Sequence, residues 1–478
     1  MPAGPTLLKN FIGGEWVPAA ASAEVPVVDP RTETLVVRVP AGSAEDADAA
    51  VRAARAATSD WAATPLRERV RLVERVANAV ESHIADLAKL ERREMGKPLR
   101  EAELFIRSGV QALRSSIKHA HEYQFVEAHA GEGDTQIEVV RLPLGVVALI
   151  VPWNFTVTNV LLAVGPLLLA GNTVVVKPSE KAPLSAVRMF ELLELPRGVL
   201  NLLLGDGRAG EPLAAHPGVD LVHFTGSVKT GQTVGALAAS NLHRAVLELG
   251  GNDPAIVDAG VDPAWAAQQL AYACFVNSGQ ICTSVERIYV HTEIADAFIE
   301  ALVAQAEVYT KGGDGSEPSP LGPLVDARQR QIVHRHVSDA VSRGAELLAG
   351  GYLPDGPGFY YPATVLLGVE DEADLLQEET FGPVAPIVVV RDFDEAIDRA
   401  QRSPFGLAAT ILSADPRNIS RAQELPAGIV WINEWQGGGF DRTYEPAGIS
   451  GMGATGGAAS YDAATRPMTI VHARAKAR

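Results

Sequence analysis

Two residues that are far apart in the sequence have the chemistry needed for covalent catalysis on a carbonyl group. Cys282 lies in a segment, residues 275–284, that is rich in small and amide side chains and could bring backbone amides close to the sulfur. A cysteine attacks as the thiolate, so it needs a lowered pKa or a nearby base. Glu248, followed closely by Gly250 and Gly251, is the candidate base. The simpler alternative is that Cys282 is a small buried apolar residue, the usual state of a free cysteine.

Polar residues follow two of the expected strands, at the end where ligands bind to a parallel sheet. Asn154 could donate a hydrogen bond to a developing oxyanion, although a turn asparagine after a proline is also common. Lys177 offers a cation, and Glu180 offers a carboxylate that could accept hydrogen bonds from ribose hydroxyls. Alternatively, Ser179 and Glu180 simply begin a helix; both interpretations can hold together.

A third group of polar residues follows the strand expected at 221–224. Gly226, Ser227 and Gly231 lie at the start of a helix, a location that favours a phosphate group. Their spacing matches neither the dinucleotide fingerprint nor the P-loop, so the motif is weak by itself. One reaction uses all of these groups together: the oxidation of an aldehyde through a thioester, with hydride transfer to a nicotinamide.

The elements that must position these residues are read from the apolar pattern. Three long amphipathic helices are expected first, at 43–57, 66–90 and 99–121. Apolar strands then alternate with helices in two blocks, which predicts two parallel sheets covered on both faces, joined near residues 249–254. The strands are expected at 146–151, 173–176, 199–204, 221–224 and 245–249, and then at 255–257, 287–291, 364–367, 387–390, 410–412 and 429–432. Two further β-like segments, 135–142 and 468–474, would leave open edges, which favours an arm that pairs with another subunit.

Composition excludes several functional classes. A net charge of −17 argues against nucleic acid or an anionic membrane as a partner. The two cysteines cannot form a disulfide framework, and there is no Cys/His cluster for a metal; His334 and His336 are expected on a solvent-exposed helix face. The longest apolar run, 160–170, is far short of a membrane span, and no signal peptide is recognised at the start. A cytoplasmic protein is therefore expected.

The motifs described above belong to a longer ordered series. Matching motifs lie at 11–16, 94–98, 152–155, 177–180, 224–227, 248–251, 279–282, 379–384, 405–407, 428–433 and 450–453. In this order and spacing, the chain resembles the NAD(P)-dependent aldehyde dehydrogenase superfamily over essentially its whole length. The resemblance implies an α/β fold of two Rossmann-like doubly wound domains with a small β oligomerisation arm. It implies an NAD-binding domain of residues 1–122 and 143–249, a catalytic domain of residues 250–450, and an arm of residues 123–142 and 451–478.

The resemblance also implies a role for each site residue. Cys282 is the nucleophile, Glu248 the general base, and Asn154 with the Cys282 backbone amide the oxyanion hole. The implied cofactor contacts are Trp153, Lys177, Ser179, Glu180, Gly226, Ser227, Gly231, Glu379 and Phe381. NAD is favoured over NADP because Glu180 accepts hydrogen bonds from a diol but repels a phosphate. The implied substrate contacts are Phe155, Thr158, Asn159, Leu162, Val276, Ile281 and Thr283, with Trp435, Phe440 and Tyr444 at the mouth of the tunnel. A homodimer or homotetramer is expected.

The chain departs from the family pattern near its end. Residues 446–453 are two residues shorter than the usual motif and lack its lysine, and Ala454-Thr455 stands where many members have Arg-Glu. A second, proton-relaying carboxylate is therefore in doubt. The loop 434–444 is also atypical, so substrate specificity is not carried over by the resemblance; Arg442 is a possible cation at the tunnel mouth.

Three other functions are alternatives to an aldehyde dehydrogenase that uses water. A coenzyme-A-acylating relative would tend to lack the general-base glutamate, and Glu248 is present. A catalytically silent structural relative would have no reason to keep Cys282, Glu248 and Asn154 together. A two-domain solute-binding module would have no use for a cysteine and a base that converge on one site.

Overall fold

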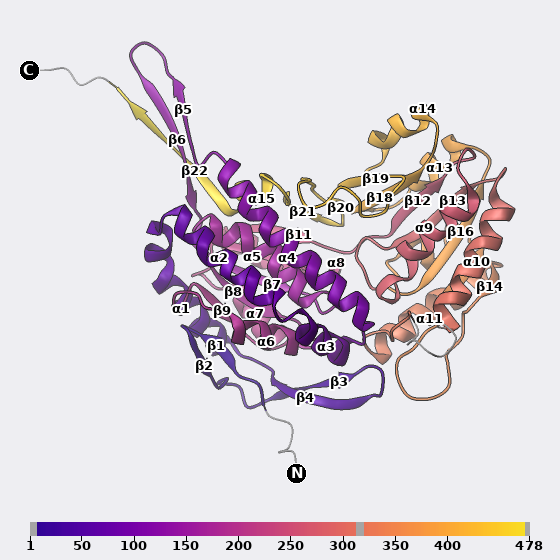
Figure 1. The fold of residues 1–478 in the computed structure, drawn as a ribbon, viewed down its shortest axis with the longest axis horizontal. Coiled ribbons are helices and arrows are strands. Elements are labelled where there is room, and N and C mark those ends of the chain that lie inside the picture. The colour runs from indigo at the N-terminus through magenta and orange to yellow at the C-terminus, as the bar shows by residue number, and fades with distance from the viewer. Residues whose placement is uncertain (1–6, 312–319, 474–478) are drawn as a thin grey trace, which may run out of the picture.

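The computed structural model describes residues 7–311 and 320–473 and contains two large, mainly parallel sheets (Figure 1). In order across the first sheet, the strands are β2 (Glu15–Val17), β1 (Asn10–Ile12), β9 (Leu200–Leu202), β8 (Thr173–Pro178), β7 (Val146–Val151), β10 (Leu221–Thr225), β11 (Arg244–Glu248) and β21 (Gly451–Met452). The five strands from β9 to β11 are parallel, and antiparallel strands extend the sheet at both edges.

Helices cover both faces of this first sheet. One face packs against α2 (Leu66–Glu81), α3 (Ile84–Met95), α4 (Leu99–Glu122), α5 (Thr156–Leu169) and α6 (Leu184–Leu192), and the other against α1 (Ala44–Ala63), α7 (Gly207–Ala214) and α8 (Val228–Ser240). Strand β7 shows why its sequence is continuously apolar. Val147, Leu149 and Val151 pack on the first face, while Val146, Ala148 and Ile150 pack on the second.

The second sheet has seven strands and the same layered plan. In order they are β14 (Glu346–Ala349), β15 (Thr364–Leu367), β16 (Val384–Val390), β13 (Val285–His291), β12 (Asp253–Val257), β18 (Ala408–Leu412) and β19 (Ile429–Ile432), parallel apart from β14. Helices α9 (Pro263–Phe275) and α10 (Ala295–Lys311) cover one face; α11 (Ala327–Ser342), α12 (Asp374–Gln377) and α13 (Phe393–Ala400) cover the other. The predicted fold class, a doubly wound α/β protein with two such sheets, is confirmed.

A three-stranded sheet forms an arm that projects from the body (Figure 1). Its strands are β5 (Val126–Ala130), β6 (Gln136–Pro143) and β22 (Thr465–His472). Two of these strands correspond to the two β-like segments predicted from the sequence, but their pairing with each other was not predicted. They pair with each other antiparallel, from Thr465 opposite Pro143 to His472 opposite Gln136. Apolar alternation identifies a strand but not its partner, which here lies more than three hundred residues away in the sequence.

Two further differences from the expected elements have local causes. The helix expected at 66–90 is two helices, because the chain turns at Ser82 and His83, where the Ser82 hydroxyl donates to the carbonyl of Asn78 (2.8 Å). The amphipathic pattern continues on both sides of this turn, so the sequence does not reveal it. The hairpin β3 (Glu24–Asp29) and β4 (Thr34–Pro40) was not predicted.

Short elements complete the described chain. They are β17 (Phe405–Gly406), which pairs with β20 (Ala447–Gly448), the helices α14 (Pro416–Ile419) and α15 (Ala459–Ala464), and the 3₁₀ helices at Val276–Gly279 and Ser420–Glu424. No helix within the described residues is both long enough and apolar enough to span a membrane.

Candidate active site

The loop that carries Cys282 is held in an unusual backbone conformation. Between α9 and β13, Asn277, Ser278 and Gly279 all have positive φ angles, of 52°, 58° and 69°. A Cβ atom at Gly279 would collide with the backbone of Gly382, so this position requires glycine. Strained residues of this kind persist only when the surrounding structure holds them.

Hydrogen bonds from buried side chains hold this loop. The Ser278 hydroxyl donates to the carbonyl of Gly322 (2.7 Å). The Gln280 amide donates to the Asn277 carbonyl (3.1 Å) and accepts from the backbone N–H of Val325 (2.9 Å). The position of the Cys282 sulfur is therefore set by a fully packed loop and not by a mobile one.

Asn154 connects the first sheet to this loop. It follows strand β7, is buried, and donates through Nδ2 to the carbonyl of Gln280 (3.0 Å). One hydrogen of the amide nitrogen remains free for a ligand. Within the described residues, the Asn154 Oδ1 atom is buried without a hydrogen-bond partner. The sequence predicted that Asn154 and Cys282 belong to one site. In the structure, Asn154 contacts the loop that carries Cys282.

The thiol of Cys282 lies among carboxyl groups. Burial raises the pKa of this thiol strongly, and the negative charges of Glu379, Asp253 and Glu248 raise it further, while the backbone amide of Thr283 acts in the opposite direction. A raised pKa favours the protonated thiol. A protonated thiol must lose its proton to a base as it attacks.

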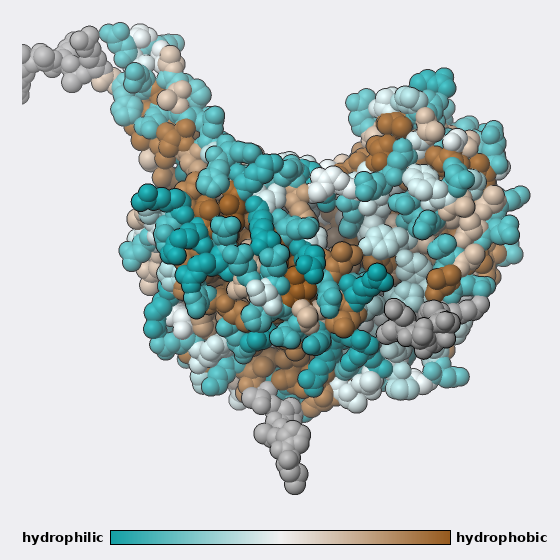
Figure 2. Space-filling view, viewed as in Figure 1, coloured by the Kyte–Doolittle hydropathy of each residue, from teal (hydrophilic) through white to brown (hydrophobic). Residues whose placement is uncertain are grey.

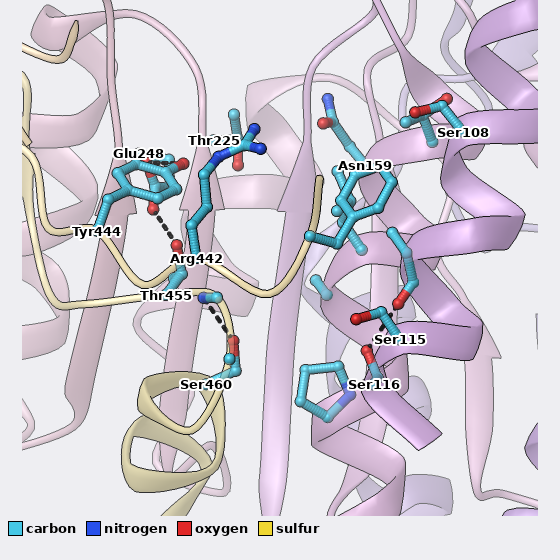
Figure 3. Close-up of a pocket in the computed structure, with 18 of the residues that line it drawn as sticks. Ser108, Ser115, Ser116, Asn159, Thr225, Glu248, Arg442, Tyr444, Thr455 and Ser460 are labelled. Carbon is cyan, nitrogen blue, oxygen red and sulfur yellow. Dashed lines mark hydrogen bonds between the residues drawn. The ribbon is translucent and has the colours of Figure 1, made fainter. Parts of the chain in front are cut away.

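Glu248, the predicted general base, lies at the end of β11. Its two oxygen atoms each accept a hydrogen bond from a hydroxyl group: Oε2 from Tyr444 (3.0 Å) and Oε1 from Thr455 (2.9 Å) (Figure 3). Burial raises the pKa of Glu248 to about 7, and the two hydroxyl groups limit the increase because they stabilise the ionised form. A carboxylate with a pKa close to neutrality suits general base catalysis.

Tyr444 and Thr455 are paired by their own backbones. The N–H of each donates to the carbonyl of the other, at 3.0 and 2.9 Å, in an antiparallel bridge. Residues paired in this way project their side chains to the same face, which explains how both reach Glu248. Tyr444 was expected at the tunnel mouth, but its hydroxyl group donates to Glu248, the predicted general base. Thr455 was not predicted, although it occupies the position where relatives carry the acidic residue.

Three predicted cofactor residues lie at the end of β8. The buried ammonium group of Lys177 donates to the carbonyls of Pro178 (2.9 Å) and Gly205 (2.6 Å), so one of its three hydrogens remains for a ligand. Burial lowers the pKa of Lys177. The hydroxyl of Ser179 donates to Glu180 (3.4 Å), which is half-buried at the same edge of the sheet.

The predicted phosphate motif lies at the N-terminus of α8. The Ser227 hydroxyl caps this helix by accepting from the N–H of Thr230 (3.4 Å). A Cβ atom at Gly231 would collide with Leu249, and one at Gly226 would collide with the ring of Phe224. The two glycines thus have a packing role, whether or not they also leave room for a phosphate.

A turn from the second sheet carries Glu379 and Phe381, which contact residues that follow strands of the first sheet. Glu379 accepts from the backbone N–H of Gly251 (3.2 Å), and a Cβ atom at Gly250 would collide with the Glu379 carboxyl group. The ring of Phe381 packs edge-to-face on Trp153, with centroids 5.6 Å apart. This turn of the second sheet therefore contacts both the Gly250–Gly251 segment and Trp153, which follows a strand of the first sheet.

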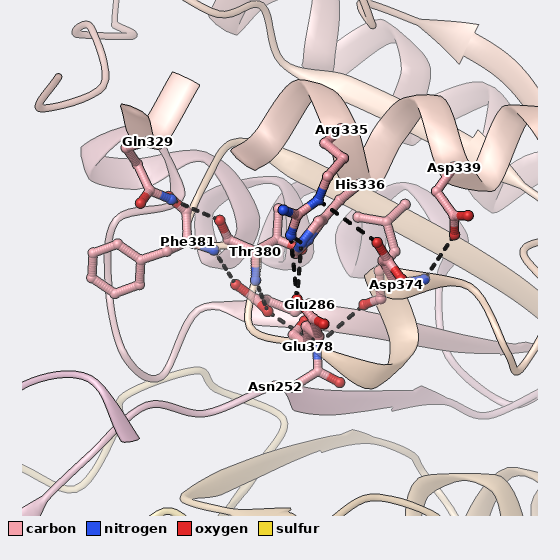
Figure 4. A network of polar contacts seen from close by, with 11 residues as sticks. Asn252, Glu286, Gln329, Arg335, His336, Asp339, Asp374, Glu378, Thr380 and Phe381 are labelled. Atoms are coloured by element: carbon pink, nitrogen blue, oxygen red, sulfur yellow. Dashed lines mark hydrogen bonds and ion pairs between the residues drawn. The ribbon is translucent and has the colours of Figure 1, made fainter. Parts of the chain in front are cut away.

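A buried network holds this turn (Figure 4). The carboxylate of Glu286 accepts from the N–H groups of Thr380 (2.9 Å) and Phe381 (2.8 Å), and from the side chain of Asn252 (3.0 Å). This role was not predicted, because a glutamate in a strand carries no sequence signal of it. Phe381 itself has a positive φ of 51°, which the two hydrogen bonds to Glu286 stabilise.

The same network corrects one expectation about histidines. His336 was expected to be exposed to solvent, but it is fully buried, with Nδ1 3.1 Å from the Thr380 hydroxyl and Nε2 3.4 Å from Glu378. His334 is half-buried beside Tyr361 (3.2 Å). No group of three or more potential metal ligands is found among the described residues.

Cys282 and Glu248 line one cavity of about 310 Å³. Of the predicted substrate residues, eight line it: Phe155, Thr158, Asn159, Leu162, Ile281, Thr283, Phe440 and Tyr444. Val276 and Trp435 are not part of the lining; Trp435 instead donates to the carbonyl of Thr283 (2.9 Å) from behind the loop. One wall was not predicted, a stripe of α4 at helical spacing, formed by Ser108, Ala112, Ser115, Ser116 and His119.

Comparison with known proteins decides the family. The model of the aldehyde dehydrogenase family matches residues 16–470. The chain belongs to this family. The Escherichia coli lactaldehyde dehydrogenase is 34% identical over 96% of this chain and 97% of its own length, and its crystal structure superposes with a TM-score of 0.94 over 98% of this chain and 99% of the other. A chloroplastic aminoaldehyde dehydrogenase of Arabidopsis thaliana is 38% identical over 88% of this chain and 87% of its own.

A solved relative also bears on the cofactor. The betaine aldehyde dehydrogenase of Staphylococcus aureus, in complex with NAD⁺, is 30% identical with a TM-score of 0.92, over 97% of this chain and 94% of the other. This aldehyde dehydrogenase is thus an oxidoreductase of a family that uses NAD or NADP. The groups at its sheet edges suit such a cofactor: carboxylates for ribose hydroxyls, one free ammonium hydrogen, and a capped helix N-terminus for phosphate.

Proposed function

We propose that this aldehyde dehydrogenase oxidises an aldehyde to a carboxylic acid with NAD⁺ and water, through a thioester on Cys282. The observation that carries the proposal is the cavity in which the half-buried Cys282 and the twice hydrogen-bonded Glu248 carboxylate lie together. A hydrolytic enzyme needs a base for water, and Glu248, with its pKa of about 7, can supply one.

In the first half of the reaction, Sγ of Cys282 bonds to the aldehyde carbon. The thiol proton is released to solvent water as this bond forms, so Glu248 stays ionised for the second half. The negative charge on the former carbonyl oxygen is stabilised by the free amide hydrogen of Asn154 and by the backbone N–H of Cys282. Bound NAD⁺ would accept a hydride from this carbon. The carbon would then be joined to Sγ as a thioester.

In the second half, Glu248 takes a proton from water as the water oxygen bonds to the thioester carbon. The bond between carbon and sulfur then breaks, the acid leaves, and Cys282 regains a proton. A coenzyme-A-acylating enzyme would use a thiol in place of water and would not need this base. The two hydroxyl groups on Glu248 therefore support hydrolysis.

The cofactor proposed is NAD in preference to NADP. Glu180 lies at the end of β8, where its charge would accept hydrogen bonds from a ribose diol and repel a 2′-phosphate. We assign Lys177, Ser179, Glu180, Ser227 and Trp153 to the adenosine and pyrophosphate portion, and Glu379 and Phe381 to the nicotinamide riboside. The division into an NAD-binding domain, a catalytic domain and an oligomerisation arm at the stated boundaries is part of the same proposal.

The test is a comparison of two variants with a matched control. Glu248→Gln should release one equivalent of NADH per site in a rapid burst and then stop, because hydride transfer precedes the step that needs the base. Cys282→Ala should show no burst. Cys274→Ala should turn over, because Cys274 is fully buried and its thiol contacts the carbonyl of Val285 (3.2 Å) away from the cavity. Steady turnover by Glu248→Gln would contradict the assignment of the base.

A further inference from the structure

Arg442 places a positive charge in the substrate cavity. It lies between Phe440 and Tyr444 and lines the same cavity as Cys282. In the view of Figure 3, its guanidinium group lies between Tyr444 on one wall and Asn159 on the other. The side chain is half-buried, its pKa is lowered by burial, and its guanidinium carbon is 5.9 Å from the ring centroid of Trp431.

The guanidinium group is held along one side and free along the other. Nη1 donates to the carbonyls of Gly437 (3.1 Å) and Gly439. Among the described residues, no acceptor contacts Nε or Nη2, and no carboxylate lies within ion-pair distance of Arg442. The Nε–Nη2 side is one of the edges through which arginine binds a carboxylate with two parallel hydrogen bonds.

The acidic groups nearest in the chain and in the cavity are already engaged. The carboxylate of Asp441 accepts from Ser115 (2.8 Å) and Lys118 (3.0 Å) and contacts His119 (3.2 Å). Both oxygens of Glu248 accept hydrogen bonds from hydroxyl groups, as described above. Arg442 is thus a half-buried cation with no counter-ion among the described residues, which favours the binding of an anion in the cavity.

A second polar group faces the same space. Asn159, on α5, lines the cavity, and its side-chain amide makes no hydrogen bond within the described part of the chain. Asn159 can therefore donate to an anion held by Arg442. The reacting end of the cavity is occupied by Cys282 and Glu248, so an anion at Arg442 would belong to the far end of a substrate.

We propose that the substrate is an aldehyde that carries a carboxylate at its other end, bound by the Nε–Nη2 edge of Arg442. This inference rests on the proposed aldehyde oxidation and names its substrate class. It also predicts discrimination: an aldehyde with a quaternary ammonium group would place a second cation beside Arg442 and should be disfavoured.

The experiment compares ω-oxo acids of four to six carbons with their methyl esters, which have the same chain but no charge. With NAD⁺ in excess, kcat/KM should be about tenfold to a hundredfold higher for one of the acids than for its ester, as a charge-assisted pair typically contributes. In Arg442→Met the ratio of acid to ester should fall to near one. Arg107→Gln removes an exposed cation that is not part of the cavity lining and should keep the wild-type ratio, which controls for long-range attraction.

A second readout does not depend on turnover. The dicarboxylate product of the preferred acid should bind the wild-type enzyme more tightly than its monoester in calorimetry, and Arg442→Met should lose this difference. Equal rates for acids and esters in the wild type would overturn the inference and leave the aldehyde oxidation intact. If neither these compounds nor any other aldehyde were oxidised, the proposed function would itself fail.

Discussion

Removal of the Tyr444 hydroxyl tests whether the environment of Glu248 sets the pH dependence of hydrolysis. Tyr444→Phe keeps the ring and deletes one of the two hydrogen bonds to a buried carboxylate. A hydrogen bond to a charged group is worth about 1.5–3 kcal/mol. At about 1.4 kcal/mol for each tenfold change, its loss should move the acid limb of the pH–rate profile upward by about one to two pH units.

The sign follows from which form the hydroxyl stabilises. Tyr444 donates to the ionised carboxylate and so lowers the pKa of Glu248, which burial raises to about 7. Without the hydroxyl, the carboxylate becomes available as a base only at higher pH. Hydrolysis by Tyr444→Phe should therefore be slow at pH 7 and recover toward the wild-type rate as the pH rises.

The assay is steady-state NADH formation across pH, with the burst amplitude measured at each point to show that hydride transfer persists. Thr455→Val should shift the limb in the same direction, because Thr455 donates to the other oxygen. Thr443→Val removes a hydroxyl from the same segment that bonds only to the Gly456 carbonyl, and should leave the profile in place. A Tyr444→Phe profile that superimposes on the wild type would refute the reasoning.

Three further predictions concern other parts of the molecule. Initial-rate kinetics should give a higher kcat/KM with NAD⁺ than with NADP⁺, and Glu180→Gln should narrow the difference, since like-charge repulsion is worth about 1 kcal/mol or more; an NADP⁺ preference in the wild type would contradict this. Gly279→Ala should lower the stability and abolish turnover, because its Cβ atom would collide with Gly382; unchanged melting and activity would show that the loop relaxes easily. Light scattering should detect a homodimer or homotetramer. Val471→Asp, at an exposed apolar position of the arm, should weaken this assembly. A wild-type chain that is monomeric at micromolar concentration would contradict the role assigned to the arm.

The sequence predicted those features of this protein that depend on local sequence patterns. Apolar strands alternating with helices indicated the two covered sheets, because burial on both faces leaves a continuous apolar run. Asn154, Lys177 and Glu248 could be found because each follows an apolar run that ends at the ligand-binding edge of a sheet. Cys282 was recognisable from its chemistry and its unusual small-residue surroundings.

The rest depends on contacts between distant segments. Thr455 lies in a glycine-rich stretch and becomes important only because a backbone bridge aligns it with Tyr444. The pairing of β22 with β6 and the burial of His336 are likewise consequences of packing that no local pattern records. The serine-rich wall of α4 has a helical spacing, but the spacing does not say which face of the helix meets the cavity.

The raised pKa of Cys282 has a consequence for the lifetime of the enzyme. Peroxides and alkylating agents react with thiolates and much more slowly with thiols. Because burial raises the pKa of this thiol, the resting protein should react slowly with such reagents. The same burial that makes the nucleophile lose a proton as it attacks thus also slows its reaction with other reagents between turnovers.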